Sequence, residues 1–259
     1  MLDSETMRKL KEMGASELAD ALDSQIDADY ATSAFETRIQ HAVDAAYGIK
    51  NNARIQSLTR LAKLRFPEAD AARVIYHEQR GLERHVVGNL ASCRFIQTST
   101  NIVFCGLAGT GKSWLGSMIA KETCKRLMRT RYIRMPDLMV EWEDALDRPQ
   151  GAKKLLRRYG GYSCLVLDEW LLEKPDERQC HFLLELLERR YAEHATVFCT
   201  QYPKGDWHAR LGGGVHADAI MDRVVHNCVW VTTGKYNLRE HIANEMRALE
   251  SSIPGNMYQ

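Results

Sequence analysis

The sequence predicts an α/β fold in which a parallel sheet lies between layers of helices, preceded by a small all-helical N-terminal region. From about residue 101 onward, short apolar runs alternate with helix-like stretches, a pattern typical of βα units. The runs are apolar throughout, as expected for strands buried on both faces of a parallel sheet. The expected strands are 101–105, 131–135, 163–167, 195–199 and 228–232, with helices that include 136–146 and 177–190.

The composition sets broad limits on the class of protein. With 259 residues, 45% of them hydrophobic, the chain can build one large domain or two unequal ones. The formal net charge is only +1, so any nucleic-acid surface must come from local clusters of charge. Seven cysteines occur without a Cys-x-x-Cys pair, which favours free thiols in a reducing compartment. Since there is no signal peptide or long apolar run, we expect a soluble, cytoplasmic protein with no membrane partner.

The N-terminal region, residues 1 to about 70, has helical periodicity and an uneven charge distribution. A capping-box pattern starts at Ser33, and a second amphipathic stretch ends before Pro67. Residues 47–65 contain five cations and no acidic residue. These cations are Lys50, Arg54, Arg60, Lys63 and Arg65. A solvated helix face and a surface that contacts phosphates both explain such a cluster, and the sequence leaves both open.

The most specific motif, residues 106–113, fits the pattern Gly-x4-Gly-Lys-Ser and lies between an expected strand and an expected helix. Glycines allow backbone N–H groups to curl around phosphates, and a helix N-terminus favours negative charge. We expect Lys112 to reach the β- and γ-phosphates of ATP and the Ser113 hydroxyl to bind Mg²⁺. The predicted nucleotide-binding residues here are Gly106, Leu107, Ala108, Gly109, Thr110, Gly111, Lys112, Ser113 and Trp114.

Polar side chains follow two other expected strands. The run from residue 163 ends in Asp168 and Glu169, which are placed to hold Mg²⁺ and to polarise an attacking water, respectively. A buried strand that simply meets solvent would also end this way. Gln201 follows the strand 195–199 and can sense the γ-phosphate or position water. Arg223 and Arg239 lie near the ends of later elements, and each alone is compatible with an ordinary surface residue.

The order of these motifs resembles the IstB family, the ATPase helpers of transposition, and more distantly the DnaC-like helicase loaders within the AAA+ ATPases. The resemblance covers nearly the whole chain. The segments that carry it, besides the phosphate loop, are 80–84, 167–170, 200–203, 206–208 and 222–227. It implies a P-loop AAA+ domain with a five-stranded parallel sheet. The implied division is a DNA-binding and oligomerisation domain at 1–70, a connector at 71–100, an AAA+ ATPase domain at 101–243 and a tail at 244–259.

The resemblance also implies roles for single residues. Arg223 matches the arginine finger, which reaches the nucleotide of a neighbouring subunit, and Arg239 matches the second sensor, which contacts the nucleotide of its own subunit. Gln201 stands where related loaders carry a polar first sensor, often asparagine. Many relatives have Asp-Asp where this chain has Asp168-Glu169, and the longer glutamate suits water activation. The predicted catalytic set is therefore Lys112, Glu169, Gln201 and Arg223, with Ser113 and Asp168 as metal ligands.

The implied function is an Mg²⁺-dependent ATPase that forms a spiral or ring-like homo-oligomer on double-stranded DNA, bends it, and recruits and stimulates a partner transposase. An arginine finger that acts in trans cannot contribute to hydrolysis in a monomer. We therefore expect hydrolysis to be stimulated by oligomerisation and by DNA. Two other functions stay open. A helicase loader would bind a hexameric helicase through its N-terminal region. A small-molecule kinase would need a lid and an acceptor pocket, which the sequence does not reveal.

Two further basic clusters are candidate DNA contacts. In related initiator and loader ATPases an inserted helical element between the second and third strands faces DNA, and an ordinary exposed helix face is the alternative. Contacts of this kind neutralise phosphates without reading bases, so we expect weak sequence preference and strong salt dependence. The candidates are Lys153, Lys154, Arg157 and Arg158 in one cluster, and Lys174 and Arg178 in the other.

Overall fold

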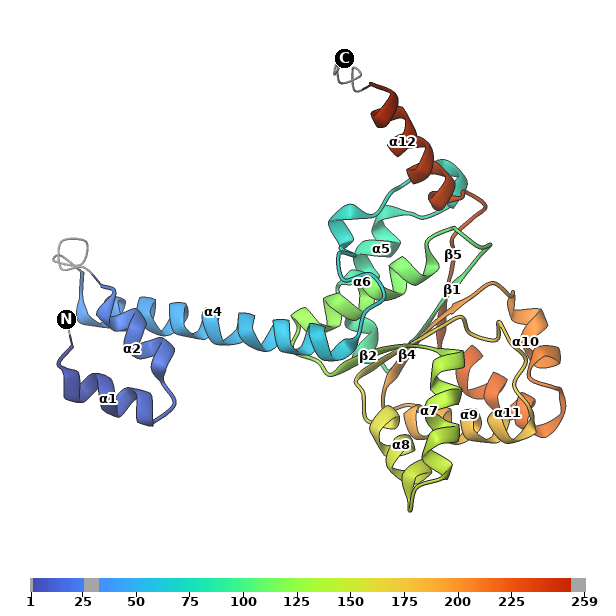
Figure 1. The fold of residues 1–259 in the computed structure, drawn as a ribbon, viewed down its shortest axis with the longest axis horizontal. Coiled ribbons are helices and arrows are strands. Elements are labelled where there is room, and N and C mark those ends of the chain that lie inside the picture. Colours follow the sequence, from blue (N-terminus) through green and yellow to red (C-terminus); the bar gives the residue numbers. More distant parts are fainter. Residues whose placement is uncertain (1, 26–32, 253–259) are drawn as a thin grey trace, which may run out of the picture. The chain divides into compact units, whose positions relative to one another are not determined.

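The computed structural model of the chain describes residues 2–25 and 33–252 (Figure 1). It divides into two compact units, Met1–Leu58 and Thr59–Gln259. The division falls inside a helix, and not at residue 70, where the sequence analysis ended the N-terminal domain. The two units are described separately below.

The N-terminal unit is helical, as predicted. It contains α1 (Ser4–Glu12), α2 (Ser16–Asp23) and most of α4 (Phe35–Ala62). The Asp3 carboxylate caps α1 by accepting hydrogen bonds from the N–H groups of Glu5 and Thr6. The two amphipathic stretches expected in this region form one 28-residue helix, α4. It ends at Ala62, earlier than Pro67, because Lys63 adopts a left-handed conformation with φ of 53°.

The second unit contains the five-stranded parallel sheet that the sequence predicted. Its strands are β1 (Asn101–Cys105), β2 (Thr130–Arg134), β3 (Cys164–Asp168), β4 (Ala195–Thr200) and β5 (Cys228–Thr232). The strand order is β2-β3-β4-β1-β5, and every neighbouring pair is parallel. The register pairs Cys105 with Thr200 and Leu167 with Phe198. The carboxyl ends of β3, β4 and β1 therefore lie side by side at one edge, where open α/β sheets bind ligands.

Helices cover both faces of the sheet (Figure 1). On one face lie α5 (Arg84–Ala91) and α6 (Lys112–Lys125), and buried residues such as Ile102 and Val197 belong to the same core as Leu115 and Met118. On the other face, alternate strand residues such as Val103 and Phe198 join a core with five further helices. These are α7 (Met135–Leu146), α8 (Gly151–Gly160), α9 (Glu177–Arg190), α10 (Lys204–Arg210) and α11 (Gly214–Val225).

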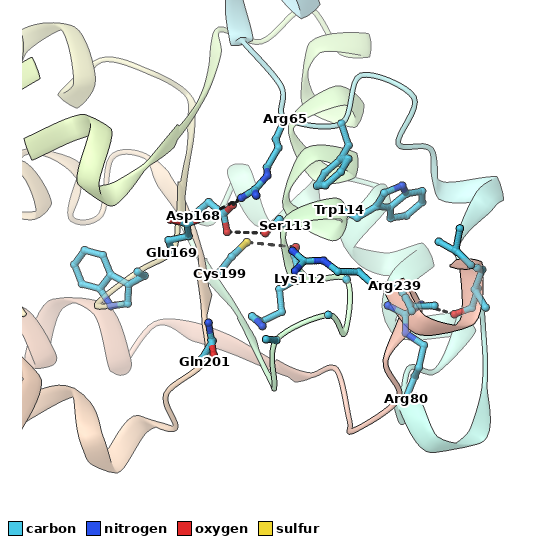
Figure 2. A pocket seen from close by; sticks show the side chains of 18 of the residues that line it. Arg65, Arg80, Lys112, Ser113, Trp114, Asp168, Glu169, Cys199, Gln201 and Arg239 are labelled. Atoms are coloured by element: carbon cyan, nitrogen blue, oxygen red, sulfur yellow. Dashed lines mark hydrogen bonds and ion pairs between the residues drawn. The ribbon is translucent and has the colours of Figure 1, made fainter. Parts of the chain in front are cut away.

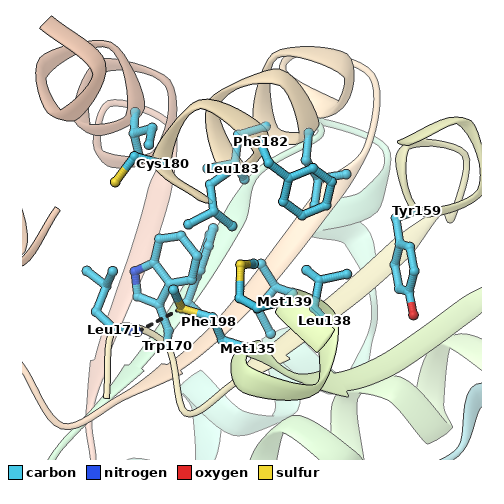
Figure 3. Packing of buried hydrophobic residues seen from close by; sticks show 14 of the residues in the cluster. Met135, Leu138, Met139, Tyr159, Trp170, Leu171, Cys180, Phe182, Leu183 and Phe198 are labelled. Carbon is cyan, nitrogen blue, oxygen red and sulfur yellow. Dashed lines mark hydrogen bonds between the residues drawn. The ribbon is translucent and has the colours of Figure 1, made fainter. Parts of the chain in front are cut away.

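The second core reaches the segment that follows β3. Trp170 is fully buried and contacts Phe198 with ring centroids 4.8 Å apart. Met135 and Met139 of α7 and Leu183 of α9 pack in the same cluster (Figure 3). The backbone N–H of Trp170 also donates to the Cys199 carbonyl at 2.9 Å. This packing fixes the turn that carries the two carboxylates at the end of β3.

Two predicted boundaries differ from the structure. Residues 71–100, expected to be a connector, contain α5 and three 3₁₀ helices, Ala71–Arg73, Glu78–Arg80 and Arg94–Ile96. Their apolar side chains, among them Val87 and Leu90, are buried in the α6 core, so the segment belongs to the second unit. The tail expected at 244–259 begins within α12 (Leu238–Ser252), and residues 253–259 lie outside the described residues.

Two other expectations concern the chain as a whole. All seven cysteines are free thiols in the structure, as the sequence analysis predicted. Over the described part of the chain, no helix combines the length and the apolar character that a membrane span requires.

Candidate nucleotide-binding site

The loop between β1 and α6 has the conformation that the motif requires. Gly109 and Gly111 lie in the left-handed region, with φ of 82° and 88°. A Cβ atom at Gly109 would lie 2.2 Å from Oδ1 of Asn237, so a larger residue would have to displace that side chain. Gly111 is the N-cap of α6 and provides no side-chain cap. The free N–H groups of the first turn of α6 therefore remain available to an anion.

A pocket of about 590 Å³ lies at the carboxyl edge of the sheet (Figure 2). It collects residues that are far apart in the sequence because parallel strands end at the same edge. Of the predicted nucleotide and catalytic residues, Gly106, Leu107 and Thr110 belong to the loop without lining the pocket. Those that line it are Ala108, Gly109, Gly111, Lys112, Ser113, Trp114, Asp168, Glu169, Gln201 and Arg239.

The Lys112 side chain lies inside the loop. Its Nζ atom donates to the carbonyl oxygens of Gly106 at 2.8 Å and of Leu107 at 2.7 Å. Desolvation by burial lowers the pKa of Lys112. A phosphate oxygen is a stronger partner for this ammonium group than a neutral carbonyl, since it carries an opposite charge.

The Asp168 carboxylate is buried and its two oxygens are hydrogen-bonded. Oδ1 accepts from the Ser113 hydroxyl at 2.9 Å, and Oδ2 accepts from the Tyr132 hydroxyl and from Nη1 of Arg65, the latter at 3.1 Å. Burial and the charge of Asp168 hold the pKa of Tyr132 well above its usual value, so its hydroxyl remains a donor. The structure thus brings together the two predicted metal ligands, Ser113 and Asp168.

The Glu169 carboxylate is held by two arginines. Its Oε1 accepts from Nη1 of Arg65 at 3.0 Å, and its Oε2 lies 2.8 Å from Nη2 of Arg134. Burial would raise the pKa of Glu169, but the hydrogen bonds from Arg134 and Arg65 bring it below its ordinary value. The residue itself adopts a left-handed conformation with φ of 55°. Non-glycine residues adopt it at a cost and often at functional sites.

The structure gives Arg65, which the sequence analysis placed among the DNA contacts, a second set of partners. Arg65 lines the nucleotide pocket and forms ion pairs with Asp168 and Glu169. A run of cations does not distinguish an arginine that faces solvent from one that turns into a pocket.

The sequence analysis did not assign a role in the site to three other residues, Tyr132, Arg134 and Arg80. Tyr132 and Arg134 both belong to β2, and Arg134 is its last residue. Arg80 is 1% exposed and donates from Nη2 to the Thr110 carbonyl at 3.0 Å. Its Nε atom has no hydrogen-bond partner among the described residues. Burial lowers the pKa of Arg80, and a nearby anion would offset that desolvation.

The two predicted arginines lie in different places. Arg239, in the first turn of α12, lines the pocket. The N–H of Leu238 donates to the Gly109 carbonyl at 3.0 Å, which ties this helix to the phosphate loop. Arg223 is not among the described residues that line the pocket. Its Nε atom pairs with the Glu188 carboxylate, and its Nη1 atom donates to the Ala219 carbonyl at 2.9 Å.

The other predicted DNA contacts are exposed as well. On α8, Arg158 pairs with Glu141 while the opposite face of the helix is buried. The Arg178 guanidinium lies 5.8 Å from the centroid of the Trp142 ring. The exposed cations are Lys50, Arg54, Arg60 and Lys63 near α4, Lys153, Lys154, Arg157 and Arg158 on α8, and Lys174 and Arg178 at the start of α9.

The donor set of the pocket fits a nucleoside triphosphate with Mg²⁺. Backbone N–H groups, a buried ammonium group and the guanidinium of Arg239 suit phosphate oxygens. The Ser113 hydroxyl and the Asp168 carboxylate suit Mg²⁺, which is usually bound through one or two protein oxygens together with substrate phosphates. Within residues 2–25 and 33–252, no group of three or more His, Cys, Asp or Glu side chains could hold a metal ion by itself.

The fold and this pocket define a P-loop ATP-binding protein of the AAA+ class. Two solved structures share the fold. AMPPCP-bound DnaA from Aquifex aeolicus aligns with a TM-score of 0.57 and 18% identity, over 74% of this chain and 57% of that one. The DnaC helicase loader aligns with a TM-score of 0.55 and 17% identity, over 65% of this chain and 98% of that one.

The sequence comparisons identify the family. The family model described as IstB-like ATP binding protein matches residues 8–245. A protein of Sinorhizobium fredii described as an insertion sequence ATP-binding protein is 32% identical over 248 residues, covering 93% of this chain and 98% of the relative. The chain belongs to the family of IstB-like ATP binding proteins, which confirms the resemblance found in the sequence.

Proposed function

We propose that this protein is an Mg²⁺-dependent ATPase that assembles as a homo-oligomer on double-stranded DNA, bends the DNA, and recruits and stimulates a partner transposase. The hydrolytic part is supported by one observation: Lys112, Ser113, Asp168 and Glu169 lie in a single pocket of nucleotide size. The transposition part is supported by the family and by the insertion sequence relatives.

In the proposed reaction the residues of the pocket have different roles. The loop N–H groups, Lys112 and Arg239 bind the phosphates, while Trp114 contributes to the pocket wall. Bound Mg²⁺ neutralises charge on the β- and γ-phosphates. Glu169, with Gln201 in the same pocket, positions a water molecule and accepts its proton as the water oxygen attacks the γ-phosphorus. The bond to the β–γ bridging oxygen breaks, which releases ADP and phosphate.

The position of Arg223 supports an oligomer. In this chain the guanidinium is paired with Glu188 and lies outside the residues that line the pocket. An arginine finger contacts the transferred phosphate, so Arg223 can act as one only on the nucleotide of a neighbouring subunit. Such a residue contributes a factor of about 10³–10⁵ to hydrolysis. Assembly would therefore switch the ATPase on.

A helicase loader is the second candidate because the fold match covers 98% of the DnaC loader structure. At 17% identity this match shows the fold and does not distinguish the partner. The helicase-loader hypothesis predicts that this protein forms a stable complex with a hexameric helicase through its N-terminal unit. Recovery of a helicase and no transposase in a pull-down would favour it.

The mass of the particle in solution tests the proposed assembly. We expect a large complex, measured by mass photometry, only when duplex DNA and ATP are both present. Lys112→Ala should prevent this complex because the phosphates lose their ammonium partner. Glu169→Gln should preserve it because this variant still binds ATP but does not hydrolyse it. A monomer under every condition would contradict the proposal and remove the role of Arg223 in trans.

Charge reversal on α4 tests the proposed DNA surface. We expect Lys50→Glu, Arg54→Glu and Lys63→Glu together to weaken duplex binding to all sequences alike, because phosphate contacts carry no base information. The salt slope, d(log K)/d(log[salt]), should become less steep by up to about three. The same triple reversal on α8, at Lys153, Lys154 and Arg157, is the matched comparison. Unchanged affinity in the α4 variant would exclude that helix as the contact.

A further inference from the structure

The Arg65 side chain joins the basic segment of the chain to the catalytic carboxylates. It follows the last residue of α4 by three positions and lies over Asp168 and Glu169 (Figure 2). One nitrogen, Nη1, donates to Oδ2 of Asp168 at 3.1 Å and to Oε1 of Glu169 at 3.0 Å. The Arg65 side chain is 35% exposed, whereas that of Asp168 is 2% exposed. A partly solvated cation is thus shared by a buried carboxylate and its neighbour.

This contact engages the carboxylates on which hydrolysis depends. With Ser113 on Oδ1 of Asp168 and Arg134 on Oε2 of Glu169, all four carboxylate oxygens already accept a hydrogen bond from the protein. Mg²⁺ near Asp168 would lie close to the positive charge of Arg65, and like charges at short range repel. An attacking water would need an oxygen of Glu169 that now faces a guanidinium. The arrangement therefore opposes both metal binding and water activation.

The chain on both sides of Arg65 is attached to the ATPase core, while two of its cations stay exposed. After Arg65, the N–H of Phe66 donates to the Ser117 hydroxyl of α6 at 3.3 Å, which anchors the chain to the ATPase core. Before Arg65, Arg60 and Lys63 are exposed, whereas Ala62 is fully buried and Leu64 packs against the same core. DNA bound to the exposed Arg60 and Lys63 would therefore act within five positions of Arg65 in the chain.

We propose that Arg65 is a positioning residue that holds Asp168 and Glu169 in a pair unable to support hydrolysis until DNA engages the basic segment, residues 47–65, and withdraws the guanidinium. The coupling rests on the proposed function, since it requires DNA to bind that segment. It gives the fifth cation of the segment a role different from that of the other four. Removing Arg65 should mimic the effect of DNA on the ATPase.

Arg65→Gln tests the proposal with two readouts. In the first, ATP hydrolysis is measured with and without duplex DNA. Basal hydrolysis should rise about 1.5- to fivefold, the range of one partly exposed ion pair, and stimulation by DNA should shrink by the same factor. In the second, a fluorescent ATP analogue is titrated with Mg²⁺ in the absence of DNA. The Mg²⁺ concentration for half-maximal binding should fall by about the same factor.

Arg94→Gln is the matched control, because Arg94 is exposed and lies outside the pocket lining. It should leave both readouts at the wild-type values. Loss of hydrolysis in Arg65→Gln both with and without DNA would overturn the proposal and make Arg65 a catalytic residue. Wild-type values in both readouts would also overturn it.

Failure of the proposed function gives a different result. If wild-type hydrolysis does not respond to DNA, the coupling is overturned together with the DNA-stimulated ATPase. In that case the Mg²⁺ titration still tests whether Arg65 opposes Mg²⁺ binding. A lower half-maximal Mg²⁺ concentration in Arg65→Gln keeps Arg65 as a group that opposes the metal, and an unchanged concentration removes that role as well.

Discussion

Glu169→Gln is expected to lower kcat for ATP hydrolysis by about 10²–10⁴, the contribution of a general base. Glutamine keeps the size of the side chain and one hydrogen-bond acceptor, but it cannot take a proton from water. Nucleotide binding should persist because the phosphate partners Lys112 and Arg239 and the metal ligands Ser113 and Asp168 are unchanged. Single-turnover hydrolysis measured beside the affinity for a fluorescent ATP analogue separates the two effects.

Glu173→Gln is the matched control for that experiment. Glu173 is exposed four residues downstream of Glu169, and it does not line the nucleotide pocket. The same change of charge should leave kcat at the wild-type value there. If Glu169→Gln hydrolysed ATP at the wild-type rate, Glu169 would not be the base, and water activation would have to come from another group in the pocket.

The sheet and the phosphate loop could be predicted because their signals are local. Each strand is a short apolar run, and the predicted bounds of all five strands agree with the structure within one residue. The loop motif specifies its own conformation, since Gly109 and Gly111 stand at positive φ. A site residue at the end of β2 could have been predicted in the same way. Arg134 is the last residue of that strand and therefore reaches the same edge as Asp168.

The roles of Arg65 and Arg80 could not be predicted from local pattern. Arg65 meets its partners 103 and 104 residues away, and the run of cations before it looks the same whether the last one faces solvent or a carboxylate. The segment 71–100 posed a related problem. Its buried residues, such as Val74, Leu82 and Val87, are spaced too irregularly for a helical or strand period. Only packing against α6 identifies them as core.

Arg223→Ala is expected to lower the ATPase activity of the DNA-bound assembly by about 10³–10⁵ if Arg223 is the finger. The affinity of the chain for ATP should change little, because the residue lies outside its own pocket. Arg223→Lys should recover only part of the rate, since an ammonium group lacks the planar fork of a guanidinium. Arg94→Ala, which removes an exposed arginine elsewhere, should hydrolyse ATP at the wild-type rate.

Mixing two inactive variants distinguishes action in trans from action in cis. Arg223→Ala subunits keep an intact Glu169, and Glu169→Gln subunits keep an intact Arg223. If the finger acts across the interface, a mixed assembly contains sites that combine the intact Glu169 of one subunit with the intact Arg223 of its neighbour. Hydrolysis by the mixture should therefore exceed the sum of the two variants alone. If the mixture gave only that sum, Arg223 would not complete a neighbouring site, and its ion pair with Glu188 would be its structural role.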